Sequence, residues 1–94
     1  MNETDFRASL DAEAPPQTLS AALTALWWQR KGNWENAHIA AQSDSGKDAA
    51  WVHALLHREE GDLSNAGYWY RRAGKDVFEG SLEAEWDTIV SALC

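Results

Sequence analysis

The chain has little of what a disulfide scaffold, a cysteine-based zinc domain or a membrane protein requires. Its 94 residues contain one cysteine, Cys94, which cannot close an internal disulfide and is too isolated for a structural metal site. No stretch approaches the roughly 20 apolar residues of a membrane span. The first residues also lack the basic start and the apolar run of a secretory signal. We therefore expect a soluble, cytoplasmic protein that does not enter a membrane.

Basic side chains are also few, since 8 Lys and Arg face 15 Asp and Glu and leave a net charge of −7. A phosphate backbone would meet a repulsive field over most of such a surface, which argues against a nucleic-acid partner. The same charge is compatible with a small acidic protein that neutralises a basic partner.

Valine, isoleucine and phenylalanine are scarce, so the 45% apolar content consists mostly of alanine, leucine and six tryptophans. This composition favours helices over strands. The only two prolines, Pro15 and Pro16, stand together and stop any helix that arrives from upstream. We predict a loosely ordered N-terminal arm over residues 1–16, pinned by Phe6 and Leu10.

Two pairs of amphipathic segments follow the prolines, each with a glycine between its two halves. In residues 17–44 the apolar side chains recur at helical spacing up to Arg30, stop at Gly32, and resume from Trp34. In residues 47–74 the same order repeats, with Gly61 in the middle and a helix-ending Gly74. The patterns predict two helical hairpins.

A last apolar face runs through residues 76–94, where Asp76 and Glu79 have the spacing of a capping box. Gly80-Ser81 offers a second start for this helix. We predict an all-α fold, with residues 17–94 forming one domain of two hairpins and a C-terminal capping helix.

The two hairpins are related by a shift of 29 residues, which places Leu26 on Leu55, Gly32 on Gly61 and Ala37 on Ala66. The segment from Gly61 to Ala66, followed by Tyr70 and Ala73, resembles the turn and second helix of the tetratricopeptide repeat (TPR). The resemblance implies a right-handed, solenoid-like array. It also implies a protein- or peptide-binding module whose first helices line a groove, and it leaves self-association open.

Superposing the two hairpins defines a candidate binding face. It would bring together side chains from both first helices: Thr24, Trp28, Lys31, His53, His57 and Glu60. Two further candidates, Trp69 and Arg72, belong to an aromatic and arginine-rich segment of the kind that is enriched at protein interfaces.

A small-ligand or metal site is the alternative interpretation of the same helix. Two histidines four residues apart can ligate one ion from a single helix turn, and Glu60 adds an oxygen ligand to His53 and His57. The pair lacks the internal glutamate of a metallopeptidase motif, so ordinary hydrogen-bonded histidines remain an open interpretation. No complete catalytic signature is present, and we expect neither an enzyme nor a cofactor.

Overall fold

The computed structural model describes residues 1–94 and confirms the all-α class, because it contains helices and no strand. The six helices occupy the following ranges: α1 Glu3–Ser9, α2 Ala21–Arg30, α3 Trp34–Gln42, α4 Lys47–Glu59, α5 Leu63–Ala73 and α6 Leu82–Leu93. None of them is long and apolar enough to cross a membrane.

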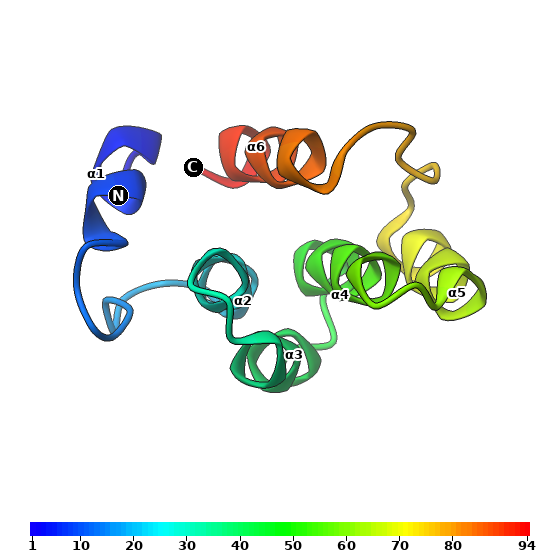
Figure 1. Ribbon diagram of the computed structural model, residues 1–94, viewed down its shortest axis with the longest axis horizontal. Coiled ribbons are helices and arrows are strands. Elements are labelled where there is room, and N and C mark those ends of the chain that lie inside the picture. The colour runs from blue at the N-terminus through cyan, green and yellow to red at the C-terminus, as the bar shows by residue number, and fades with distance from the viewer.

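Helices α2 and α3 form one antiparallel hairpin and α4 and α5 form another (Figure 1). The two turns have the same local chemistry. Gly32 and Gly61 take positive φ angles of 83° and 84°, a conformation that L side chains rarely adopt. The next residue then caps the second helix: the side chain of Asn33 accepts from the Asn36 amide, and Asp62 accepts from the Asn65 amide. Each cap stabilises its helix by about 1 kcal/mol.

Helix α4 lies at the centre of the molecule, and its middle turns are buried on nearly all sides. Val52, Ala54, Leu55 and Leu56 are fully buried because α4 packs against α2, α3, α5 and α6. Ala37 and Ala66 are buried at equivalent positions of α3 and α5, where a small side chain permits close approach of the helices.

Helix α6 packs mainly on α4 and α2, and lies over the face that these two first helices share (Figure 1). Trp86, Ile89 and Val90 are buried in this contact, and Trp86 Nε1 donates to the Leu26 carbonyl over 2.9 Å. The groove expected between the first helices is therefore filled by the chain itself.

A buried polar cluster anchors the start of α6. Glu85 is fully buried, accepts from Tyr70 Oη over 2.5 Å and pairs with Arg58 Nη1 over 2.8 Å. Arg58 also donates to the Gly80 carbonyl, which ties down the segment before α6. Burial and the contact with Glu85 raise the pKa of Tyr70, so this phenol keeps its proton and remains a donor.

The N-terminal segment differs from the expected loose arm, because residues 3–9 form helix α1. Asn2 caps this helix by accepting from the Asp5 amide over 2.8 Å, and Phe6 is fully buried with its ring 5.9 Å from that of Trp86. Arg7 pairs with Asp87 on α6 over 2.9 Å. Packing against α6, which the sequence pattern does not reveal, supplies the stability that so short a helix lacks alone.

The capping box expected at Asp76 does not form, and the last helix begins six residues later at Leu82. Ser81 caps it by accepting from the Ala84 amide over 3.0 Å. Residues 75–81 are not helical, and Phe78 instead packs against the core from this segment, with the Arg58 guanidinium 5.6 Å from its ring.

Candidate functional site

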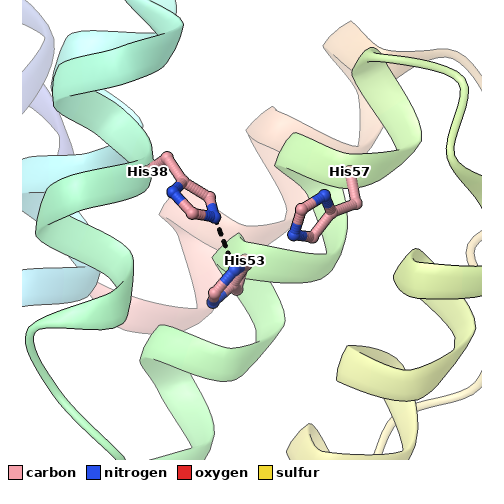
Figure 2. Close-up of side chains that lie close together, drawn as sticks. All are labelled: His38, His53 and His57. Carbon is pink, nitrogen blue, oxygen red and sulfur yellow. Dashed lines mark hydrogen bonds between the residues drawn. The ribbon is translucent and has the colours of Figure 1, made fainter.

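Three histidines meet between the two hairpins, one from α3 and two from α4 (Figure 2). His38 Nε2 and His53 Nε2 lie 2.9 Å apart and share a hydrogen bond, while the rings of His53 and His57 stack with centroids 4.9 Å apart. One ring nitrogen of each histidine lies within 4.8 Å of the other two. We call His38, His53 and His57 the histidine cluster.

Two tryptophans cover the histidine cluster from either side. Trp34 stacks on His38 with ring centroids 4.8 Å apart, and Trp69 stacks on His53 at 3.8 Å. Trp34 Nε1 also donates to the Leu56 carbonyl over 2.8 Å, which fixes the ring against α4. The imidazoles are therefore held between indole faces that belong to α3 and α5.

Glu60 fixes the orientation of His57. Its carboxylate lies 2.6 Å from His57 Nδ1, and because a carboxylate only accepts, Nδ1 carries a proton and donates to it. In the neutral ring, Nε2 then keeps a free lone pair. Figure 2 shows the second ring nitrogen of His57 turned toward the other two histidines.

The surroundings keep two of the three rings neutral at pH 7. Burial, and then the neighbouring imidazoles, lower the pKa of His53 to about 4. Burial and His57 also lower the pKa of His38. Neutral imidazole is the form that ligates a metal. Nδ1 of His53 is buried and has no hydrogen-bond partner.

The histidine cluster has the donor set of a three-imidazole metal site. A tetrahedral zinc with Zn–N bonds of about 2.0–2.1 Å places its ligand atoms about 3.4 Å apart. The 2.9 Å pair would have to open by about 0.5 Å, and the third nitrogen, now within 4.8 Å, would have to move closer. Side-chain rotations supply shifts of this size.

The metal set expected from the sequence needs correction, since Glu60 does not point into the cluster with His53 and His57. It contacts the outer nitrogen of His57, and His38 takes the third inner position. Glu60 can hold an ion only on the outer side, where His57, Glu60 and Asp62 also come close together. A four-residue spacing places His53 and His57 on one face but cannot show which residue of another helix faces them.

The expected common face of Thr24, Trp28 and Lys31 with the histidines does not form. Lys31 Nζ donates to the carbonyls of Leu10 and Ala12, and Trp28 packs edge-on to Trp27 with centroids 5.0 Å apart. Helix α3 packs on both α2 and α4, so the ring contacts of the histidines come from α3, α4 and α5 only.

The other two candidates lie beside the histidine cluster. Trp69 is half-buried against His53, and the exposed Arg72 lies over Trp69 at 5.4 Å. The residue that the sequence pattern missed is His38. The signal that could have found it is the four-residue spacing from Trp34, which places the two side chains on the same face of α3.

Comparison of the chain with protein-family models, with curated proteins and with solved structures finds no match.

Proposed function

We propose that this chain binds a divalent transition-metal ion through His38, His53 and His57. The observation that carries the proposal is the approach of three ring nitrogens to within 4.8 Å, from two helices that belong to different hairpins. Buried polar side-chain atoms in folded proteins nearly all have a hydrogen-bond partner. These three histidines instead present nitrogens to one another and leave His53 Nδ1 without a partner.

The donor chemistry favours zinc, with copper and nickel as competitors. Imidazole nitrogens suit these ions, whereas calcium and magnesium require oxygen ligands. The only thiol, that of Cys94, is exposed at the C-terminal end of α6 and is not among the residues of this site. Three protein ligands leave the fourth position of a tetrahedral ion for water or a small ligand.

A bound ion would join the two hairpins. His38 belongs to the first hairpin, while His53 and His57 belong to the second, so coordination would replace the His38–His53 hydrogen bond with a stronger link. An ion that binds only the folded chain stabilises it, by about 2.7 kcal/mol at a free concentration 100 times its Kd. The function would then be metal-dependent stabilisation or metal sensing.

Isothermal titration with zinc at pH 7.4 tests the proposal. We expect one ion per chain with a Kd of about 1 µM or lower, which corresponds to about 8 kcal/mol or more of binding free energy. His38→Ala should abolish the binding heat. Ile39→Ala is the matched control, because Ile39 is the neighbouring residue of α3 and is 59% exposed.

Two results would contradict metal binding at this place. One is the absence of heat with wild-type protein, and the other is equal zinc affinity in the His38→Ala variant. Circular dichroism of both variants without metal shows whether the helices are intact, so a loss of binding through unfolding is recognised.

We also infer that the two hairpins are copies of one TPR-like unit. The matching glycine turns, the caps at Asn33 and Asp62, and the buried Ala37 and Ala66 support this relationship. The peptide binding that the resemblance implies would need another surface, because α6 covers the shared face of α2 and α4.

A further inference from the structure

The basic side chains of this acidic protein are unevenly distributed. Five exposed Lys and Arg residues take part in none of the ion pairs, although the chain has 15 acidic residues available. One of them, Lys31, donates to the backbone carbonyls of Leu10 and Ala12, and the other four have no such partner. They are found where α4 begins and α5 ends: Lys47, Arg71, Arg72 and Lys75. We call these four residues, together with Tyr68, the α5 basic surface.

The contacts of these residues show that the two helix ends lie side by side. The Lys47 ammonium is 4.0 Å from the point that a Cβ would occupy at Gly74, immediately after α5. Lys75 Nζ lies 4.2 Å from the ring centre of Trp51, one turn further along α4. Positive charge from both helices of the second hairpin therefore gathers on one area.

An exposed aromatic group stands at the edge of this area. Tyr68 is 44% exposed, and its hydroxyl accepts from Arg72 Nη1 over 3.0 Å. The Arg72 guanidinium also lies 5.8 Å from the Tyr68 ring centre and 5.4 Å from that of Trp69. These contacts hold the guanidinium in place before any partner binds, which lowers the entropy cost of binding. Tyr, Trp and Arg are the residues that contribute most to protein interfaces.

We infer that the α5 basic surface binds a short acidic segment of a protein partner. Carboxylates of the partner would pair with Arg71, Arg72 and the two lysines, while an apolar side chain of the segment would pack on Tyr68. A long polyanion such as a nucleic acid is the poorer fit, because it would extend beyond four cations into the field of a chain with net charge −7. Asp48 follows Lys47 and Asp76 follows Lys75 in the sequence. Their negative charges would repel a longer acidic segment, so the partner segment should be short.

Selection from a library of random twelve-residue peptides tests the inference, with the full chain as target and a chelator present to keep the histidine cluster metal-free. We expect the recovered peptides to contain Asp and Glu at about twice the frequency of the unselected library, since complementary charge favours binding. The most frequent peptide, labelled for fluorescence anisotropy, should then bind Arg71→Gln/Arg72→Gln about 10-fold more weakly than wild type.

The matched control is Gln17→Glu/Thr18→Glu, which makes the same change in net charge in an exposed segment before α2. It should keep the wild-type affinity. Three outcomes would overturn the inference: no enrichment of acidic residues, equal affinity of the Arg71→Gln/Arg72→Gln variant, or equally tight binding of a twelve-nucleotide single-stranded DNA. Because the metal site is kept empty throughout, failure here is distinguishable from failure of zinc binding.

Discussion

Removal of the Arg58 guanidinium, in the last turn of α4, should strongly destabilise the fold. In the Arg58→Ala variant, the fully buried Glu85 carboxylate would lose its charged partner and keep only the hydroxyl of Tyr70. Breaking a buried ion pair by removing one partner costs about 3–5 kcal/mol. A chain of 94 residues has a total stability of about 5–14 kcal/mol. The variant would therefore lose a large share of it.

Urea denaturation followed by circular dichroism measures this loss in free energy. In thermal melts we expect the melting temperature to fall by about 12 °C or more. Glu85→Gln is the informative companion, because it carries no charge but its amide oxygen can still accept from Arg58, while its NH2 group can donate to the Tyr70 hydroxyl. Arg58 has 17% of its side chain exposed and can turn toward water, so this variant should lose only about 1–2 kcal/mol. Glu83→Gln, on the exposed side of the same helix, should be near neutral.

A loss of less than about 1 kcal/mol in Arg58→Ala, the level expected of an exposed ion pair, would contradict a stabilising role of the buried Arg58–Glu85 pair. A larger loss of stability in Glu85→Gln than in Arg58→Ala would contradict it as well. In that case the hydrogen-bond geometry around the carboxylate, rather than its charge, would account for the stability.

Three further predictions follow from the packing and the histidine cluster. Without metal, the free energy of unfolding should be at its full value above pH 6.5 and should fall as the pH drops toward 4, because His53 takes up a proton in the unfolded chain but stays neutral in the folded one. The loss approaches about 3 kcal/mol. Thermal melts across this pH range would measure it, and a flat profile would contradict the burial of His53. Ala66→Leu should overpack the second hairpin and cost about 1–3 kcal/mol, so an unchanged melting temperature would count against the tight approach of α5. Deleting residues 76–94 should expose the face under Trp86 and cause aggregation, seen as light scattering, whereas a soluble, cooperatively melting fragment would disprove the anchoring role of α6.

The hairpins could be predicted because their determinants are local. A glycine that reaches positive φ, a capping side chain after it and an alanine five residues later act within a few residues of one another, and Gly32 and Gly61 follow this rule. Helix α1 has only part of this signal, the capping side chain of Asn2, which accepts from the amide of Asp5 three residues later. Its stability, however, comes from Phe6 packing on Trp86, a contact between residues 80 positions apart.

Glu85 shows what a residue-type rule cannot show. It lies between Leu82 and Trp86 and four residues before Ile89, in phase with the apolar face of α6, so its position favours burial. Its charge favours exposure. Position decided the outcome because Arg58 and Tyr70, on two other helices, supply the partners that a buried carboxylate needs.

The histidine cluster was half predictable for the same reason. The four-residue spacing of His53 and His57 is a property of one helix, while the third ring depends on how α3 packs on α4. Trp34 links the two helices, because its Nε1 donates to the Leu56 carbonyl and its ring stacks on His38. The contact that joins α3 to α4 therefore also holds the third imidazole beside the other two. The residue pattern that builds the hairpins therefore assembles the proposed metal site, and no separate binding loop is required.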